Sequence, residues 1–273
     1  MIDFICPVCK KHLKDEGALF RCENRHSFDK SKFGYVNLLM SNSSSLKRHG
    51  DDRIMIRARK GFLSNGYYSF LRDKISEICA GLLTENADII DAGCGTCYYS
   101  AAVSERLTCC NFAGIDISKD ALEYASRQGI KFPLCVASAY NMPFESSSAD
   151  CILSIFSPDA YGEYQRVLKN GGYLIKAVPL ENHLFSLKEL IYDDPYLNPA
   201  PETKISGFET ADFIRLEREI FIDNAEDISN LFKMTPYYYK TSRENQQKLE
   251  KINELTTTAA FGILVLKARK SDE

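Results

Sequence analysis

The sequence predicts an α/β fold, in which an open sheet of mostly parallel strands follows a small metal-binding module. From residue 87 onward, short β-branched runs alternate with amphipathic helical segments, which is the pattern of βαβ units. Two pairs of metal-ligand residues precede this region, at residues 6–9 and 22–26. The 273 residues are 45% apolar and 26% charged, which indicates a globular chain and excludes disorder as the default.

The spacing of two pairs of metal-ligand residues predicts a metal-binding module at the N-terminus. Cys6-x2-Cys9 and Cys22-x3-His26 are separated by twelve residues. Two short knuckles with two ligands each can close a tetrahedron around Zn²⁺ and leave no open position, so we expect the zinc to be structural. A fold of about 40 residues needs such a crosslink to be stable. His12 is the rival to His26, which we prefer because it completes the second pair.

The charge is unevenly distributed along the chain. Residues 1–60 contain 13 Lys and Arg against 7 Asp and Glu, whereas the whole chain carries a net charge of −3. Basic side chains interleaved with the aromatics of residues 28–39 suit RNA, in which phosphates meet lysines and splayed bases stack on rings. A solvated lysine-rich surface, with the aromatics forming the module's own core, is the alternative.

A polar Ser-rich stretch at residues 41–52 reads as a linker. We therefore expect a zinc-binding RNA-recognition module over residues 1–45 and a second domain over residues 46–273. Residues 52–83 have helical periodicity that is broken at Asn65-Gly66.

The second domain begins with this helical stretch and continues as alternating strands and helices. Strands are predicted over 87–94, 110–117, 132–138, 149–157 and 171–179, with helices over 98–107 and 119–127. Two further strands, 215–222 and 258–269, flank a helical stretch and would add an antiparallel hairpin to the sheet.

The segment "DAGCGT" follows the first strand and opens a helix, which is where such folds bind ligands. Gly93 and Gly95 let the backbone approach a ligand closely. Asp116 ends the second strand 21 residues after Gly95, where a carboxylate can accept hydrogen bonds from both hydroxyls of a ribose. The glycine loop lacks the third glycine of a dinucleotide site, and Asp91 suits the cationic amino group of methionine, so we favour S-adenosylmethionine over a dinucleotide.

No apolar run approaches the length of a membrane span, and the N-terminus lacks the pattern of a signal peptide. Ten cysteines spread over a long chain without an export signal favour reduced thiols and a metal site over disulfides. We expect a cytoplasmic protein without membrane partners; whether it forms a homodimer stays open.

The chain resembles the bacterial 23S ribosomal RNA guanine-N1 methyltransferases, which join an N-terminal zinc module to a class I S-adenosylmethionine-dependent methyltransferase domain with a Rossmann-like sheet. The motifs that carry the resemblance are "CPVC…CENRHSFDKSKFGYVNLL", "ARKGFLSNGYY", "DAGCGTCYYS", "CVASAYNMPF" and "VLKNGGYLIKAVPLENHLFSLKELIYD". Each motif occurs widely by itself, but this order of motifs combined with the zinc knuckle is not widespread. The resemblance covers essentially the whole chain.

The resemblance implies a set of site residues. The zinc ligands are Cys6, Cys9, Cys22 and His26, and the cofactor site is lined by Tyr68, Gly95, Thr96 and His183. The general methyltransferase pattern adds Asp91, Gly93, Asp116 and Ser138. Two adjacent positions depart from the family: Thr96 stands where the family has an acidic residue, and Cys97 stands where a glycine is usual. The Cys97 side chain either crowds the methionine end of the cofactor or points away from it.

The predicted reaction is methyl transfer from S-adenosylmethionine to N1 of a guanine in a hairpin loop of 23S ribosomal RNA. The N1 proton must leave, and Asp159, just after the fourth strand, is the candidate general base; backbone and pocket contacts around Ser157 and Pro158 are the alternative. Without Cys6 or Cys22 we expect RNA methylation to fail while cofactor binding largely survives. The alternatives are a small-molecule methyltransferase whose zinc module serves dimerisation, and a non-catalytic zinc-dependent RNA-binding protein.

Overall fold

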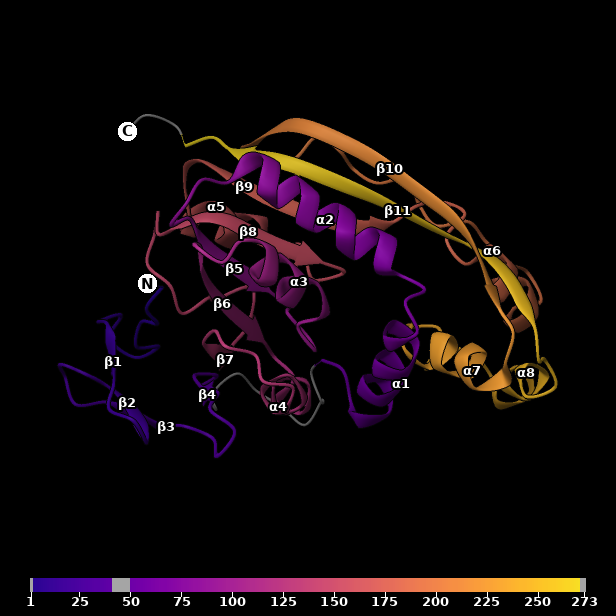
Figure 1. Ribbon diagram of the computed structural model, residues 1–273, viewed down its shortest axis with the longest axis horizontal. Coiled ribbons are helices and arrows are strands. Elements are labelled where there is room, and N and C mark those ends of the chain that lie inside the picture. The colour runs from indigo at the N-terminus through magenta and orange to yellow at the C-terminus, as the bar shows by residue number, and fades with distance from the viewer. Residues whose placement is uncertain (1, 41–49, 271–273) are drawn as a thin grey trace.

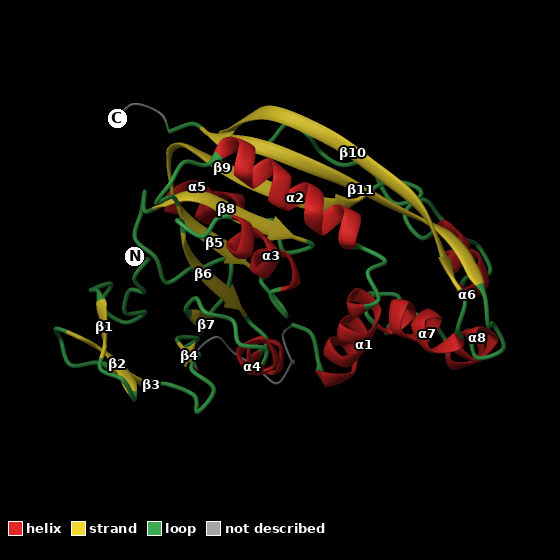
Figure 2. Ribbon diagram, in the orientation of Figure 1, coloured by secondary structure: helices red, strands yellow, loops and turns green. Residues whose placement is uncertain are grey.

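A computed structural model describes residues 2–40 and 50–270 of the chain, and its main body is one large sheet with helices on both faces (Figure 1 and Figure 2). Its strands are β4 (Val36–Asn37), β5 (Asp88–Ala92), β6 (Asn111–Asp116), β7 (Leu134–Val136), β8 (Ala149–Ile155), β9 (Leu168–Pro179), β10 (Phe208–Ile222) and β11 (Leu255–Ala268). They are ordered β10-β11-β9-β8-β5-β6-β7-β4. The predicted α/β fold is confirmed.

The helices are α1 (Arg53–Ser64), α2 (Ser69–Leu82), α3 (Tyr98–Arg106), α4 (Lys119–Arg127), α5 (Tyr161–Val167), α6 (Phe185–Ile191), α7 (Ala225–Lys233) and α8 (Arg243–Leu249). The predicted break at Asn65-Gly66 separates α1 from α2. Asp52 begins α1 because its carboxylate accepts hydrogen bonds from the backbone N–H groups of Ile54 and Met55, at 2.8 and 3.0 Å. Among the described helices, none is both long and apolar enough to pass through a membrane.

The last two strands, β10 and β11, form the antiparallel hairpin that the sequence predicts. This hairpin extends well beyond the region in which it pairs with β9, its neighbour in the sheet. β11 pairs with β9 only over Phe261–Lys267, whereas β10 and β11 remain paired as far as Ile222 and Leu255. The distal half of the hairpin therefore projects past the sheet and carries α7 and α8 at its end, where α7 lies beside α1 (Figure 1). Residues far apart in the sequence thus meet near α1.

Successive side chains of a central strand point to opposite faces of the sheet, so the apolar core is divided between these two faces. Ile89 of β5 belongs to a cluster formed with α1, α2 and α7, whereas Ile90 belongs to a cluster on the opposite face. That second cluster also contains Phe4 and Leu13 from the start of the chain. The N-terminal module and the main sheet therefore share one core.

The N-terminal module also joins the main sheet through its backbone. Its own sheet is antiparallel and consists of β1 (Leu13–Asp15), β2 (Leu19–Cys22) and β3 (Ser27–Asp29). The next strand, β4, pairs in parallel with β7 and becomes the edge strand of the large sheet. The sequence did not predict this pairing, because a two-residue strand has no periodicity to detect. Of the linker expected at 41–52, residues 41–49 lie outside the described residues.

Candidate functional site

A cavity of about 970 Å³ lies at the carboxyl ends of the central parallel strands. Ligands bind at this edge in open α/β sheets, because the loops that follow adjacent parallel strands meet there. The structure brings six of the predicted cofactor residues together in its lining: Asp91, Gly93, Gly95, Thr96, Asp116 and Ser138.

The glycine loop that follows β5 lets a ligand approach its backbone closely. Gly93 has a left-handed backbone, φ 89°, and a Cβ at this position would stand 2.5 Å from the Cβ of Ser157. Only glycine fits there without moving the loop that follows β8. A Cβ at Gly95 would meet nothing closer than the Arg59 guanidinium, at 3.6 Å. The backbone at Gly95 therefore faces open space in the cavity.

Asp116 ties the glycine loop to the end of β6. One carboxylate oxygen accepts a hydrogen bond from the Gly95 N–H at 2.8 Å, and the other accepts one from the Ser118 N–H at 2.7 Å. A carboxylate has about four acceptor positions, so two remain for a ligand's hydroxyls. Burial raises the pKa of Asp116, and the two backbone hydrogen bonds oppose that shift.

Asp91 is a buried carboxyl group at the end of β5. Burial raises the pKa of Asp91 to about 7, and the nearby charge of Asp116 adds to the shift. No basic side chain forms an ion pair with Asp91 within residues 2–40 and 50–270. A cationic group entering the cavity would supply the missing countercharge.

Cys97 has a left-handed backbone, φ 61°, which is a conformation that glycine favours. Its thiol is buried against Cys94, Leu122 and neighbouring apolar side chains. Cys97 is absent from the lining of the 970 Å³ cavity. Of the two orientations considered from the sequence, the structure therefore has the one that points away from this cavity.

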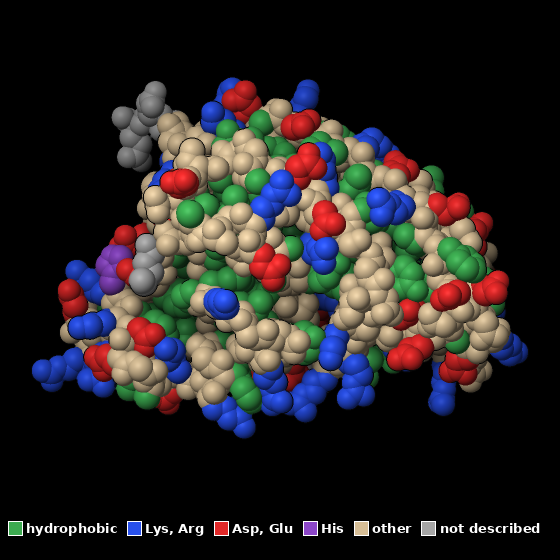
Figure 3. Space-filling model, viewed as in Figure 1, with side chains coloured by type: hydrophobic (Ala, Val, Ile, Leu, Met, Phe, Trp, Pro, Cys, Tyr) green, Lys and Arg blue, Asp and Glu red, His purple; other side chains and the backbone are tan. Residues whose placement is uncertain are grey.

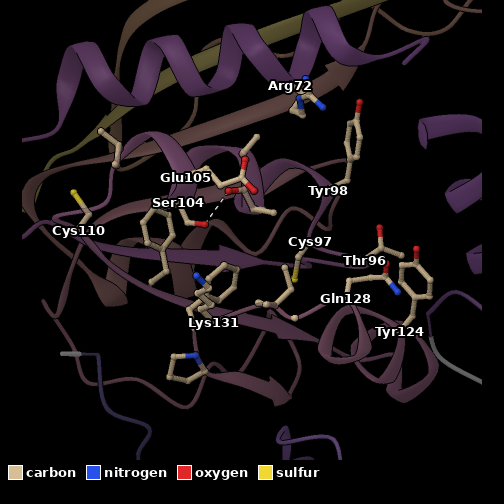
Figure 4. Close-up of a pocket in the computed structure, with 18 of the residues that line it drawn as sticks. Arg72, Thr96, Cys97, Tyr98, Ser104, Glu105, Cys110, Tyr124, Gln128 and Lys131 are labelled. Carbon is tan, nitrogen blue, oxygen red and sulfur yellow. Dashed lines mark hydrogen bonds between the residues drawn. The ribbon is translucent and has the colours of Figure 1, made fainter. Parts of the chain in front are cut away.

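A second groove, of about 1040 Å³, lies on the outer side of the glycine loop along α3 (Figure 4). Cys97 lines it, and at one end the Arg72 guanidinium lies 5.4 Å over the Tyr98 ring. This groove is the larger of the two, but its lining includes neither Asp91 nor Asp116. The cavity at the strand ends is therefore the better candidate site.

Tyr68 and His183 lie behind this cavity and are not in its lining. Both are buried, and both rings pack against Phe261, at centroid distances of 4.9 and 4.8 Å. The Tyr68 hydroxyl has no hydrogen-bond partner among the described residues. Phe156 links this aromatic group to the cavity, because its ring contacts Phe261 and also lines the cavity.

His183 has a fixed tautomer. Its Nδ1 accepts a hydrogen bond from the Ala260 N–H at 3.1 Å, so the ring proton resides on Nε2. Burial lowers the pKa of His183 to about 3, and the nearby Lys188 charge acts in the same direction. The side chain is therefore a neutral hydrogen-bond donor through Nε2.

Asp159, the candidate general base, lies just past the segment that lines the cavity. Its carboxylate pairs with the buried ammonium of Lys176 at 2.7 Å, while 64% of the Asp159 side chain is exposed. Lys176 also donates to the Ser157 carbonyl oxygen at 3.3 Å. One oxygen of Asp159 is thus held in place by a buried cation, a partner that the sequence did not suggest.

Several lining residues come from elements that the sequence analysis left outside the site. Asn37, Leu39 and Met40 follow the zinc module and form one wall. Arg59 of α1 also lines the cavity and pairs with Asp51. Arg59 belongs to a visible cluster of basic residues, which could have signalled a role, but nothing local indicated that residues 37–40 reach the cavity.

The four predicted metal ligands come together in the N-terminal module. The Sγ atoms of the three cysteines and a ring nitrogen of His26 all lie within 4.8 Å of one another. The separations Cys6 Sγ–His26 Nδ1, Cys9 Sγ–Cys22 Sγ and Cys22 Sγ–His26 Nδ1 are 3.5, 3.6 and 3.4 Å. Metal–ligand bonds of about 2.0–2.3 Å in a tetrahedron give edges of roughly 3.3–3.8 Å, so the cluster fits Zn²⁺.

Two family models match the chain. The model described as "RlmA, N-terminal" matches residues 4–44, and the model described as "Methyltransferase domain" matches residues 89–172. A Streptomyces fradiae 23S rRNA (guanine(748)-N(1))-methyltransferase is 30% identical over 68% of this chain and 66% of its own length. YxjB of Bacillus subtilis, provisionally named a 23S rRNA (guanine-N(1)-)-methyltransferase, is 29% identical over 96% of both chains.

The chain thus joins a module of the family described as "RlmA, N-terminal" to a methyltransferase domain, and it is similar to proteins named as 23S rRNA guanine-N1 methyltransferases. A solved structure of a provisionally named methyltransferase in complex with the Haloferax volcanii Trm112 activator matches 80% of this chain and 96% of that chain, with a TM-score of 0.52 and 17% identity. This likeness concerns the fold alone. The methyltransferase domain and the metal-ligand cluster of the N-terminal module imply S-adenosylmethionine and zinc as the cofactors.

The cavity fits the methyl donor on three counts. Its volume is that of a typical small-molecule site. The buried Asp91 carboxyl group matches a cationic amino group, and the free acceptor positions of Asp116 match ribose hydroxyls. The open space at Gly95 leaves room for the ligand itself.

Proposed function

We propose that this chain transfers the methyl group of S-adenosylmethionine to N1 of a guanine in a hairpin loop of 23S ribosomal RNA. The names of the two relatives support this substrate. N1 lies on the Watson–Crick edge, so the guanine must be unpaired or extruded to react. Such a substrate implies that the enzyme works in the cytoplasm.

The observation that carries the proposal is the attachment of the zinc module to the cavity. Its last strand, β4, is part of the methyltransferase sheet, and Asn37, Leu39 and Met40 line the cavity. A bound RNA could therefore touch the module and the cavity at once. We propose that residues 1–45 act as the RNA-recognition module and residues 46–273 as the catalytic domain.

A basic strip supports RNA as the partner. It consists of exposed lysines and arginines from the module, α4 and α1, namely Lys32, Arg53, Arg57, Lys60, Lys119 and Arg127. Side-chain contacts connect the three elements: Arg127 lies 4.3 Å from the Phe33 ring centre, and Lys60 lies 5.5 Å from that of Tyr124. Figure 3 shows Lys and Arg side chains, in blue, gathered along the lower edge of the molecule, where Figure 1 shows α4 and α1. Such a strip favours phosphate contacts, which supply sequence-independent affinity.

S-adenosylmethionine supplies an electrophilic methyl group on a sulfonium when it is bound. We propose that Asp91 holds its amino group and that Asp116 and Ser138 hold the adenosine part. The backbone from Gly93 to Thr96 would then lie along the cofactor, with Tyr68 and His183 closing the site from behind. Alignment of donor and acceptor is the protein's main contribution to an in-line displacement.

For the proton on N1 we retain Asp159 as the proposed acceptor. It comes directly after Pro158, which lines the cavity, and Lys176 fixes one of its oxygens. The other oxygen can accept a proton if the guanine lies at the mouth of the cavity.

The proposal is tested by incubating the purified protein with 23S ribosomal RNA and S-adenosylmethionine. A methyl group on N1 blocks base pairing, so a new reverse-transcription stop at one guanine in a hairpin loop is expected. The control RNA carries adenine at that position and should give no stop. Methylation of a small molecule, with no stop on the RNA, would contradict the proposal.

A further inference from the structure

Phe156 stands out among the residues that line the cavity. It follows the last residue of β8, its backbone is left-handed with φ 55°, and 44% of the residue is exposed. A left-handed backbone is unfavourable for a bulky aromatic residue, and an exposed phenylalanine gains little from burial. Strained residues of this kind persist where the surrounding structure holds them, and they cluster at functional sites.

The backbone on both sides of Phe156 is held by hydrogen bonds. Its own N–H donates to the Ala177 carbonyl oxygen at 3.1 Å. The hydroxyls of Ser154 and Ser157 are 2.9 Å apart, and the Tyr164 hydroxyl donates to the Pro158 carbonyl oxygen at 2.7 Å. These contacts hold the backbone of the strained turn in place.

The ring of Phe156 is supported on its inner side. Its centroid lies 5.5 Å from that of Phe261 and 6.2 Å from that of Tyr99. The remaining ring surface is exposed in the cavity that Asp91 and Gly93 also line. Phe156 therefore offers a fixed, supported aromatic surface to a ligand.

The sheet order puts Phe156 at the reacting end of the cavity. β8 adjoins β5, which ends near Asp91, whereas β7, with Tyr140 after it, lies beyond β6 on the side of Asp116. If Asp91 holds the amino end of the donor and Asp116 its ribose, the transferred methyl group is nearer to β8. The acceptor base must then lie beside Phe156 rather than beside Tyr140.

We propose that the exposed face of Phe156 stacks on the target guanine and holds its N1 edge toward the methyl donor. This assignment rests on the function proposed above and adds the residue that receives the base. Stacking on an aromatic side chain replaces the base stacking that the guanine loses when it leaves the RNA helix.

A tryptophan reporter tests this contact directly, because the chain contains no tryptophan. The variant Phe156→Trp is titrated with a 23S rRNA hairpin transcript in the absence of cofactor. Stacking on guanine should quench its fluorescence, and a transcript with the target base removed should quench it far less. Phe221→Trp is the matched control, since Phe221 is also exposed but lies on β10 outside the cavity lining. Equal quenching by both transcripts, or none, would overturn the assignment.

A second pair of variants separates the effect of the Phe156 ring from the effect of its left-handed backbone. Phe156→Gly removes the ring and relieves the left-handed strain, which offsets the lost packing against Phe261 and Tyr99, so the variant should still fold. Its kcat/KM for RNA should fall roughly 5- to 100-fold, while the Kd for S-adenosylmethionine changes less than about twofold. Phe156→Tyr should restore most of the activity. Parental kcat/KM in the glycine variant would refute the inference while the function stands, whereas a parent protein that leaves the RNA unmethylated would refute the function itself.

Discussion

The Asp116 carboxylate accepts a hydrogen bond from the Gly95 N–H at 2.8 Å, which fixes the loop after β5 to the end of β6. These two residues stand 21 positions apart in the sequence but form one wall of the cavity. Because Asp116 also accepts from Ser118, it orders the loop and retains acceptor positions for a ligand.

Replacing Asp116 with asparagine should weaken cofactor binding. An amide has one acceptor oxygen, so either the Gly95 or the Ser118 N–H would face an NH₂ group. A hydrogen bond to a charged group contributes about 1.5–3 kcal/mol, so the Kd for S-adenosylmethionine should rise roughly 10- to 100-fold in calorimetry. Asp120→Asn is the control, because Asp120 pairs with Arg53 outside the cavity lining. Equal affinity in the Asp116 variant and this control would contradict the assigned role.

Asp91 should make cofactor binding depend on pH. Burial raises the pKa of Asp91 from 3.8 to about 7 in the ligand-free protein, so the carboxyl group is largely protonated below pH 6. A cationic amino group binds the charged form, and affinity should therefore rise as pH increases from about 6 to 8. Titrations at several pH values should show this slope in the parent and a flatter one in Asp91→Asn. Equal slopes would exclude Asp91 as the group responsible.

The same pKa shift determines how Asp91 affects stability. A carboxyl group with a raised folded-state pKa favours folding in its protonated form, and this contribution is lost as pH rises from 3.8 through about 7. Above neutral pH, Asp91→Asn should therefore increase the free energy of unfolding, by up to about 4 kcal/mol. Urea unfolding at pH 5 and pH 8 tests this: the gain should be larger at pH 8. A destabilised variant at pH 8 would show that the charge is compensated.

Loss of zinc should impair the cofactor site as well as RNA recognition. Residues 37–40 reach the cavity from β4, and β4 is positioned by the module that zinc braces. Cys9→Ser should lose bound zinc, measured by atomic absorption, and should bind S-adenosylmethionine several-fold more weakly. This differs from our expectation from the sequence, in which cofactor binding largely survives. Cys109→Ser, an exposed cysteine outside the cluster, is the control. Parental cofactor affinity in zinc-free protein would favour the earlier expectation.

Asp227 should hold the tip of the long hairpin against α1. Its buried carboxylate accepts hydrogen bonds from Asn65 and from the Tyr67 hydroxyl, the latter at 3.0 Å. Burial, followed by contact with Asp227, raises the pKa of Tyr67 to about 12, so the hydroxyl stays a donor at neutral pH. Asp227→Ala leaves these donors unpaired and should cost about 1–3 kcal/mol in urea unfolding. Tyr67→Phe should cost less, because Asn65 still pairs with Asp227; the reverse order would argue against this network.

Asp159 can be tested as the proton acceptor separately from its ion pair. Asp159→Asn can still accept a hydrogen bond from Lys176 but cannot take a proton at neutral pH. We expect kcat on RNA to fall about 10²- to 10⁴-fold, with cofactor affinity unchanged. Asp159→Glu is the control that restores the carboxylate. If kcat in the asparagine variant matches the parent, the N1 proton leaves by another route, such as water.

The sequence by itself determined most strands of the large sheet and the helices that follow its first two parallel strands, and it pointed to the zinc ligands and the cofactor loop. These features depend on local signals: the spacing of Cys6, Cys9, Cys22 and His26, the alternation from residue 87, and the glycines beside Asp91. The helix predicted over 119–127 is α4 as observed, because its period and its Ser118 cap are both local.

Only the tertiary structure decided which distant residues share the cavity. β4 is too short to be recognised alone, so its pairing with β7, and with it the wall formed by residues 37–40, could not be predicted. Lys176 appears in the sequence as one residue of an apolar strand, and its partner Asp159 is identified only in space. Phe156 reads locally as the end of a buried strand, yet the turn after β8 exposes its ring. Spacing along the chain encodes local geometry, whereas contacts between separate elements depend on how the whole sheet packs.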